Sequence, residues 1–420
     1  MAFVLDSDDA IGYIGTKCCF EMEFLVAKER EGYSYSDEDA ASDSGSDVSS
    51  LCQLRWQCPA DEEDDLNEVL YQCSLVFSKN NESVEIIEDS DPASALPWDS
   101  LQSESWILQP ARFAVARPGC PEEYDWIGVR LRSPLFFESE LTNPNSTAKW
   151  CIGALRMTLR LHVNSTCPFD VLIRTSRMAL DHVKKTATIV WLLERDMLLY
   201  LRPDVADDTP GRMMPVTSHA AAATRPLEGV DNSRPQYPEM LAAMERHTPR
   251  LINDAKQEQL QRLWACIDVT ELAEVLQSSD GQSLAFSIYG SPRDEDGEPP
   301  SACIFAFRYA LWHPYDDVDV TNFWITLALT LCRVMVVNSA QFKRSNRRTD
   351  QIMEDFDGRD IGAGERWKIL AERLSLDADW SWEWDMVVQQ YLPGRRLSRE
   401  VLDSQPPLGQ IPELHMYRSR

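Results

Sequence analysis

The chain has 420 residues, of which 41 are Lys or Arg and 68 are Asp or Glu, giving a formal net charge of −27 at pH 7. Hydrophobic residues make up 44% of the chain, which is enough for one large core or two smaller ones. The charge argues against nucleic acid and anionic membranes as partners, because both are bound through Lys and Arg. The sequence also lacks an apolar run of about 18 residues, the length that a membrane-spanning helix needs.

The N-terminal part of the chain predicts strands with one short helix between them. Residues 14–26 (IGTKCCFEMEFLV) are rich in β-branched and aromatic side chains, which favour a strand. Residues 126–131 and 155–163 have the same character and are predicted as two further strands. Apolar residues at helical spacing predict a short helix over 62–75.

The longest predicted helix covers 169–201, with Asp170 as its N-cap and Arg202-Pro203 as its end. The later elements are a helix, two paired strands and an apolar helix, at 249–263, at 283–289 with 302–309, and at 321–337. Strands with helices inserted between them predict an α+β fold. We expect an antiparallel sheet that forms a concave cleft, with helices on one side and a helical C-terminal region.

Charge and composition divide the chain into segments. We expect the first strand of the main domain in residues 1–30 and a disordered acidic loop over 31–65, where low hydrophobicity and high charge cannot offset the entropy of ordering. Residues 66–340 would complete the domain, interrupted by a long irregular loop over 204–238. Residues 341–420 are predicted as a C-terminal region that is first basic and then rich in tryptophan, and helical overall.

The eleven cysteines form no C-x-x-C pair, and several lie inside apolar runs, as Cys303 and Cys332 do. This is typical of reduced, buried cysteine. The N-terminal residues have no cationic, apolar leader of the secretory kind. We therefore expect an intracellular, cytoplasmic protein with free thiols.

Most common catalytic motifs are missing from the sequence: the chain has no G-x-G-x-x-G, G-x-x-x-x-G-K, G-x-S-x-G or H-E-x-x-H. The segment Phe20-Glu21-Met22-Glu23-Phe24 is the most informative one that remains. On a strand, Glu21 and Glu23 share one face and the three apolar residues take the other. The two carboxylates could face solvent, or they could hold a hard cation such as Mg²⁺.

Four segments in order support a specific resemblance, with a helix between the third and the fourth. They read FEMEF at 20–24, WIGVRLRSPL at 126–135, LRLHV at 159–163 and IFAFR at 304–308, and the helical segment ATIVWLLE lies at 187–194. This order resembles the amidoligase family as found in fungi, which is related to glutamine synthetase and gamma-glutamylcysteine ligase. The family has an E-x-E strand, a V-E-L-V-S-P strand, an H-V-H strand, a helix with W-x-x-E and an E-F-R strand. The resemblance covers residues 11–340.

The resemblance implies ATP- and Mg²⁺-dependent formation of an amide between a carboxylate and an amine, the substrate being a small molecule or a peptide. It implies that Glu21 and Glu23 are metal ligands and that His162 and Arg308 are catalytic. It further implies that Arg308 and Arg202 contact the ATP. In such ligases the magnesium ions bridge the phosphates and stabilise the charge that develops during phosphoryl transfer.

Several positions depart from the family pattern. Arg130 and Ala306 stand where the family has glutamates, and Arg160 stands where it has the first histidine of H-V-H. Added positive charge opposes Mg²⁺ binding. The two glutamates could instead form a salt-bridge network with Arg130, Arg160 and Arg308. We therefore expect weakened or lost catalysis, the alternative being a non-catalytic binding or scaffold protein that retains the ligase cleft.

The family interpretation makes a geometric prediction. Glu21, Glu23, Arg130, His162 and Arg308 should line one concave face of a single sheet. If they lie on different faces or in different domains, the order of the motifs is a coincidence and the chain has an unrelated fold.

Overall fold

A computed structural model describes residues 16–32, 55–87, 104–141, 146–176, 178–202, 212–224, 236–290, 302–311, 319–359 and 361–373. Its strands are β1 Lys17–Glu29, β2 Val84–Ile86, β3 Trp106–Pro110, β4 Tyr124–Arg132, β5 Phe136–Phe137, β6 Leu161–His162, β7 Pro168–Ser176, β8 Phe286–Gly290 and β9 Ala302–Leu311. They form one sheet in the order β2-β3-β4-β1-β7-β9-β8, with β5 and β6 pairing with β1. All pairs are antiparallel except β2 with β3.

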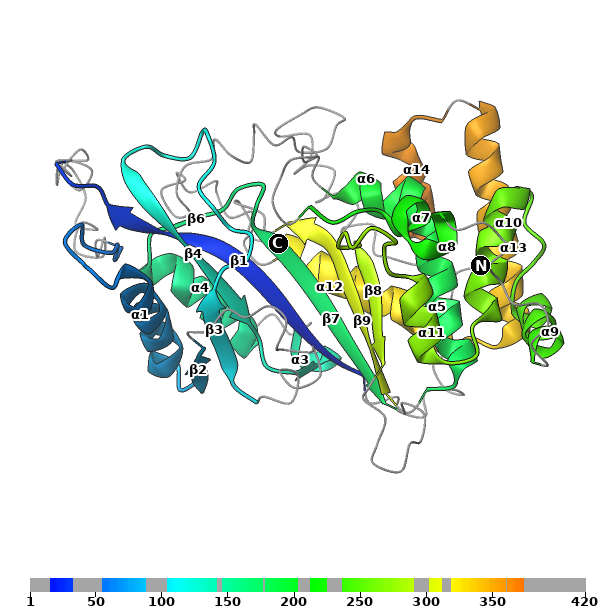
Figure 1. Ribbon diagram of the computed structural model, residues 1–420, viewed down its shortest axis with the longest axis horizontal. Helices are drawn as coiled ribbons and strands as arrows, with labels where there is room; N and C mark the ends of the chain where they lie inside the picture. The colour runs from blue at the N-terminus through cyan, green and yellow to red at the C-terminus, as the bar shows by residue number, and fades with distance from the viewer. Residues whose placement is uncertain are drawn as a thin grey trace, which may run out of the picture.

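Helices surround this sheet unevenly (Figure 1). Before β8 they are α1 Asp65–Lys79, α3 Glu138–Leu141, α4 Thr147–Thr158, α5 Leu180–Leu193, the π-helix η2 Glu194–Leu198, α6 Leu199–Leu201, α7 Val216–His219, α8 Ala221–Thr224, α9 Tyr237–His247, α10 Asp254–Ala265 and α11 Val269–Val275. After β9 they are α12 Asp319–Arg333, the 3₁₀-helix η4 Val334–Val336, α13 Ser339–Arg359 and α14 Ala363–Arg373. Figure 1 shows α4 and α12 behind the sheet, while the strands face the viewer.

The central strand β1 divides its side chains between two environments. Phe20, Met22 and Phe24 are buried on the helix side, where Phe20 contacts Trp106, which in turn lies 4.9 Å from Phe77 of α1 between ring centroids. Tyr309 of β9 points to the same side and stacks on Trp324 of α12. The main core therefore lies between the sheet and the helices, and the other face of the sheet is left for a cleft.

These observations confirm the predicted α+β class, the helices on one side and the helical C-terminal region. The strand prediction over 14–26, the short helix over 62–75 and the hairpin of 283–289 with 302–309 are also confirmed, as β1, α1, and β8 paired with β9. The predicted helix of 249–263 corresponds to α10 and that of 321–337 to α12 and η4.

Two predicted elements are wrong. Residues 147–158 form α4, so the strand predicted over 155–163 reduces to the two residues of β6. Residues 168–176 form β7, so the helix predicted over 169–201 begins only at Leu180, and Asp170 is a strand residue. The sequence of β7, PFDVLIRTS, fits either structure by its spacing, and pairing with both β1 and β9 decides in favour of the strand.

The segment boundaries also need correction. Trp56 and Cys58 form β-bridges and Cys58 is fully buried, so the end of the acidic loop predicted over 31–65 is ordered, while residues 33–54 lie outside the described ones. The irregular loop predicted over 204–238 contains α7 and α8.

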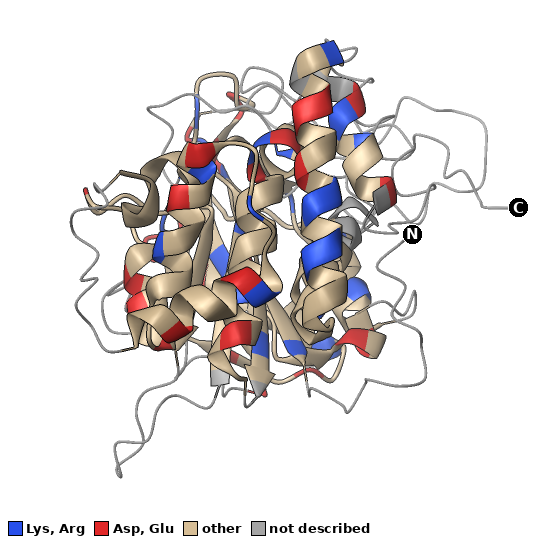
Figure 2. Cartoon of the chain, turned by 90° about the vertical axis from the view of Figure 1, so that its right-hand side faces the viewer, with Lys and Arg blue, Asp and Glu red and all other residues tan. Residues whose placement is uncertain are grey.

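In the C-terminal region, the basic cluster at 343–348 belongs to α13, and the tryptophan-rich segment lies outside the described residues. Figure 2 faces this end of the molecule, where Lys and Arg gather along the lower part of a long vertical helix. Among the described helices, none is long and apolar enough to cross a membrane. The ten cysteines in the described ranges are all buried and form no disulfide bond.

Two buried lysines connect α5 to the ends of other helices. Nζ of Lys184, which is fully buried, donates to the carbonyl oxygens of Trp264 and Cys266 at 2.7 Å each, where α10 ends. Nζ of Lys185 donates to the carbonyl of Val337 at 2.7 Å, just after η4. Burial lowers the pKa of both lysines. The C-terminal carbonyls of a helix have no intrahelical partners, so these ammonium groups satisfy them and fix the helices against α5.

We expect Lys184→Met to lower the free energy of unfolding by about 3 kcal/mol, because two buried carbonyls lose a charged donor. Urea denaturation followed by circular dichroism would measure this change. The matched control is Lys79→Met, which removes an exposed lysine at the end of α1 and should change stability by less than about 0.5 kcal/mol. Equal effects of the two changes would contradict the assigned role of Lys184.

Candidate functional site

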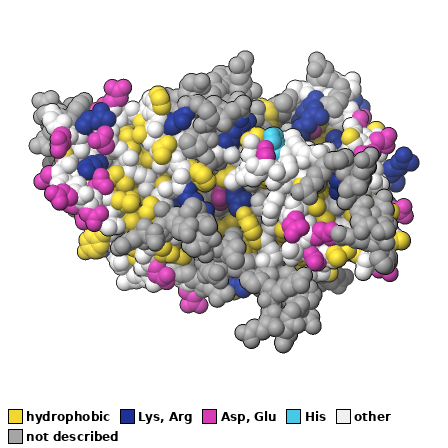
Figure 3. Space-filling model, in the orientation of Figure 1, with side chains coloured by type: hydrophobic (Ala, Val, Ile, Leu, Met, Phe, Trp, Pro, Cys, Tyr) yellow, Lys and Arg dark blue, Asp and Glu magenta, His cyan; other side chains and the backbone are white. Residues whose placement is uncertain are grey.

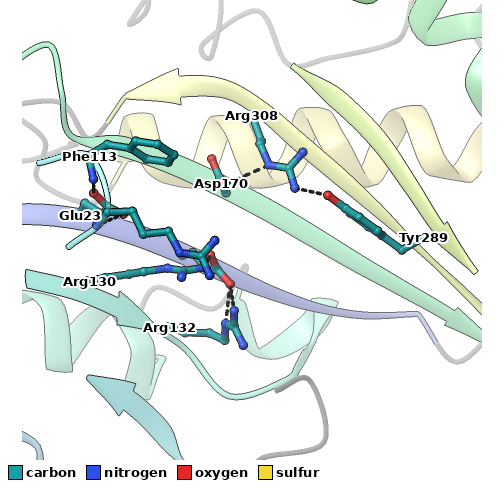
Figure 4. A network of polar contacts seen from close by, with 9 residues as sticks. Glu23, Phe113, Arg130, Arg132, Asp170, Tyr289 and Arg308 are labelled. Atoms are coloured by element: carbon teal, nitrogen blue, oxygen red, sulfur yellow. Dashed lines mark hydrogen bonds and ion pairs between the residues drawn. The ribbon is translucent and has the colours of Figure 1, made fainter. Parts of the chain in front are cut away.

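A pocket of about 460 Å³ opens on the face of the sheet opposite the helices. Its floor comes from β1, β4, β7, β8 and β9. Its walls come from the loop after β3, from Met213, and from α11 with the residues that follow it up to 284. Four arginines and three carboxylates line it: Arg112, Arg130, Arg132, Arg308, Glu21, Glu23 and Asp170. Figure 4 shows most of these side chains side by side on neighbouring strands.

Glu21 is held by two arginines of the neighbouring strand. Register pairs Glu21 with Arg132 and Glu23 with Arg130, so all four side chains share one face. Arg130 donates from Nη2 to one oxygen of Glu21, and Arg132 donates from Nε to the other. Burial alone would raise the pKa of Glu21, but Arg130 and Arg132 hold it well below its usual range. The Glu21 carboxylate is therefore ionised and fully engaged with protein donors.

Glu23 is held by backbone. Its oxygens accept hydrogen bonds from the N–H groups of Arg112, Phe113 and Ala114, at 3.1, 2.8 and 2.8 Å. Burial raises the pKa of Glu23, and the three backbone donors offset only part of that increase. A carboxylate in such a nest of successive N–H groups orders the loop that supplies them. Glu23 thus fixes the loop that carries Arg112 and Phe113 to the edge of the pocket.

Gly128 makes room for this loop. A Cβ at this position would lie 2.4 Å from the carbonyl oxygen of Ala114 and 2.8 Å from Cβ of Ala111. Both contacts are shorter than van der Waals separation, so only glycine fits beneath the loop at its present height.

Asp170 and Arg308 form the other half of the site. Nε of Arg308 donates to Oδ2 of Asp170 at 3.2 Å, and its Nη atoms donate to the hydroxyls of Ser287 and Tyr289 at 3.0 and 2.6 Å. Oδ1 of Asp170 is buried and has no hydrogen-bond partner in the described part of the chain. Burial raises the pKa of Asp170 to about 7, even though Arg308 opposes this change. The charge of Asp170 therefore changes near neutral pH.

Positive charge exceeds negative charge in the pocket, although the whole chain carries −27. Arg112 is exposed, and burial of part of its side chain together with the nearby Arg130 lowers its pKa. Near the centre of the face in Figure 3, basic side chains lie around an acidic one. This excess of positive charge favours an anion as the ligand of the pocket.

The residues present do not fit Mg²⁺. The carboxylate oxygens of Glu21 accept hydrogen bonds from two guanidinium groups, and those of Glu23 accept hydrogen bonds from three backbone N–H groups. Among the described residues, no group of three or more His, Cys, Asp or Glu side chains could hold a metal ion. Mg²⁺ demands near-octahedral oxygen ligands and tolerates no cation among them. In this structure Glu21 therefore has an ion-pairing role and Glu23 a loop-anchoring role, and neither carboxylate is free for the metal-binding role that the resemblance implies.

The structure brings four of the five predicted residues to the pocket: Glu21, Glu23, Arg130 and Arg308. His162 lies on the same face, opposite Leu25 of β1, yet it is fully buried 5.0 Å from the ring of Trp126 and does not line the pocket. Burial lowers the pKa of His162 to about 4, so its ring is neutral at pH 7. In this position the predicted catalytic residue has no access to a bound molecule.

Arg202, which the resemblance implies as an ATP contact, lies on the helix side. It donates to the carbonyl of Met213 at 2.7 Å and contributes to the charge environment of Tyr309. Arg160 bonds to the hydroxyl of Tyr124, so it takes no part in the expected network with the glutamates. Asp316 and Asp317 lie outside the described residues.

Sequence reasoning missed Arg112, Arg132, Asp170 and Tyr289. Strand alternation could have found Arg132, because it is two residues from Arg130 and must share its face. Asp170 was not recognised as a site residue because the sequence pattern assigns it to a helix as the N-cap. No local signal marks Arg112 or Tyr289.

Comparison with protein-family models finds no family that matches this chain, and no curated protein or solved structure matches it.

The first prediction from this site concerns Asp170. A folded-state pKa of about 7 against an ordinary value of 3.8 means that the folded protein retains a proton which the unfolded chain loses. Stability should therefore fall as pH rises from about 4 to about 7. Asp170→Asn should remove this fall, so that the variant gains on the order of 4 kcal/mol relative to the unmodified chain across that range.

Urea denaturation at several pH values would measure the difference between the two forms. The control is Asp125→Asn, a change at an exposed carboxylate, which should leave the pH profile as it is. Parallel profiles for the Asp170 variant and the unmodified chain would contradict the assigned protonation.

The second prediction concerns Gly128→Ala. The added Cβ should lift the loop from Glu23 and destabilise the protein by about 2 kcal/mol, with faster amide hydrogen exchange at residues 112–114. Gly153→Ala on α4 meets nothing within 4 Å and should stabilise by about 0.5 kcal/mol. Unchanged exchange at the loop in the Gly128 variant would show that the loop does not depend on this close approach.

Proposed function

We propose that this chain is a divergent amidoligase-like protein whose cleft binds a small molecule without ATP-dependent amide synthesis. The convergence of Glu21, Glu23, Arg130 and Arg308 on one pocket supports the family interpretation. They come from three segments in the order of the family motifs and lie on one face of one sheet.

One observation carries the proposed loss of ligase chemistry: the Glu21 carboxylate is engaged by both Arg130 and Arg132. Where the family has a further glutamate, Arg130 supplies a cation. Ala306, at the position of the E-F-R glutamate, is fully buried beside Cys19 and Leu172, and Leu172 in turn lines the pocket. A site with these charges repels divalent metal ions and attracts acids.

The pocket nevertheless has the properties of a binding site. Its volume falls within the range of small-molecule sites, and its polar groups lie on rigid strands. The described residues therefore support binding without the metal-dependent step. A peptide or small acid would be the ligand, as the resemblance implies for the substrate.

We expect Arg130→Glu to make the site responsive to Mg²⁺. The change leaves Glu21 beside a like charge and should lower the free energy of unfolding by about 3 kcal/mol. Millimolar Mg²⁺ should restore part of this loss in the variant and should not stabilise the unmodified chain. Thermal denaturation with MgCl₂ and with an equal ionic strength of NaCl would measure both effects.

The control is Arg250→Glu, which reverses the charge of an arginine that is 86% exposed in its side chain and should give neither effect. Calorimetry of the unmodified chain with Mg²⁺ and ATP completes the test. Micromolar, Mg²⁺-dependent ATP binding would contradict the proposed loss of the ligase step.

A further inference from the structure

The pocket has two chemically different ends. At the first, Arg112, Arg130 and Arg132 surround a single fully shared carboxylate, Glu21. At the second, Asp170 presents a buried oxygen that no described donor reaches. β4 and β7 are separated by β1 alone, so the backbones that carry Arg130 and Asp170 lie about 10 Å apart at the usual spacing between strands.

The first end has unused donors. Arg130 bonds to Glu21 through Nη2, and no other hydrogen bond of its guanidinium occurs in the described ranges. The side chain of Arg112 makes no hydrogen bond there, although it lines the same pocket as Arg130; burial and the charge of Arg130 lower its pKa. Two guanidinium groups of this kind repel each other unless an anion lies between them, and each can grip a carboxylate or phosphate with two parallel N–H groups.

The second end has an unused acceptor. Oδ2 of Asp170 is bonded to Arg308, whose other nitrogens donate to Ser287 and Tyr289, so Arg308 cannot turn to satisfy Oδ1. A buried acceptor without a donor costs free energy, which a bound N–H or ammonium group would recover. The groups that face Asp170 are Glu21 and Glu23 from β1, Arg130 from β4 and Arg308 from β9.

We infer that this pocket is a metal-independent site for an organic acid whose carboxylate or phosphate is held by Arg112 and Arg130 and whose N–H or ammonium group reaches Oδ1 of Asp170. The inference deepens the proposed function and rests on it, since it assigns the ligand class of the same cleft. The acidic group of such a ligand neutralises the excess positive charge of the arginines at one end. Its N–H or ammonium group donates a hydrogen bond to Oδ1 of Asp170 at the other end. A simple dianion would place its second charge against Asp170.

The test uses four probes: hexanoate, 6-aminohexanoate, pentyl phosphate and 5-aminopentyl phosphate. Each pair differs only in a terminal ammonium group, and the two pairs differ only in the acidic group. Affinities for the full chain would be measured by calorimetry at pH 8.5, where the Asp170 carboxyl is ionised, and in EDTA, which removes divalent ions. We expect both amino probes to bind at least 10-fold more tightly than their partners without the amine, and the tighter pair identifies the acidic group of the natural ligand.

Two variants separate the ends of the site. Arg112→Gln should weaken all four probes at least 5-fold, and it should fold normally because its side chain is exposed and has no described hydrogen bond. Asp170→Asn should abolish the advantage of the amino probes while leaving the other two almost unchanged. Arg250→Gln, at an exposed surface position, should alter none of the affinities.

Two outcomes would overturn the inference. One is the absence of millimolar binding by any probe in EDTA, and the other is binding that survives Arg112→Gln. If probes bind only when Mg²⁺ is present, the proposed loss of the metal site fails as well. Binding of the probes in EDTA alongside Mg²⁺-dependent ATP binding would refute the proposed function and leave this inference standing.

Discussion

The structure depends on placing a carboxylate in the central strand of the sheet. β1 pairs with β4 on one side and β7 on the other, and it is buried over most of its length. A charge at Glu21 can exist there only with compensating charge at hydrogen-bond distance. The alternating arginines of β4 supply it, and a slip of one residue would turn them to the other face. The register of β1 against β4 thus brings the arginines to Glu21, and the ion pairs in turn stabilise that register.

The same arrangement decides what the cleft can bind. Neutralising Glu21 internally requires two guanidinium groups, and with Arg112 and Arg308 they give the pocket more positive than negative charge. The resemblance to amidoligases and the chemistry of this site therefore point in different directions: the first implies a metal-bound nucleotide and the second an acid bound directly by arginine.

Glu23 shows how a buried carboxylate can fix the position of a loop. Its oxygens accept hydrogen bonds from three N–H groups of the loop that begins at Ala111. That loop approaches β4 so closely that Gly128 is required beneath it. On the helix side, Glu194 performs a comparable task, since it accepts the N–H groups of Val216 and Thr217 and the hydroxyl of Tyr309. In both places a buried carboxylate orders a backbone segment.

The sequence by itself determined the strand of Glu21 and Glu23, the common face of these two residues, the final hairpin and the α+β class, because alternation and strand propensity act within a few residues. Only the tertiary structure decided that residues 168–176 are a strand and that Asp170 therefore faces the cleft, since pairing with β1 and β9 overrode a local pattern that fits a helix. The tertiary structure also places His162 outside the pocket, because its ring is buried beside Trp126. Partners that lie about a hundred residues apart, as Glu21 and Arg130 do, leave no local trace, because register and burial are properties of the assembled sheet.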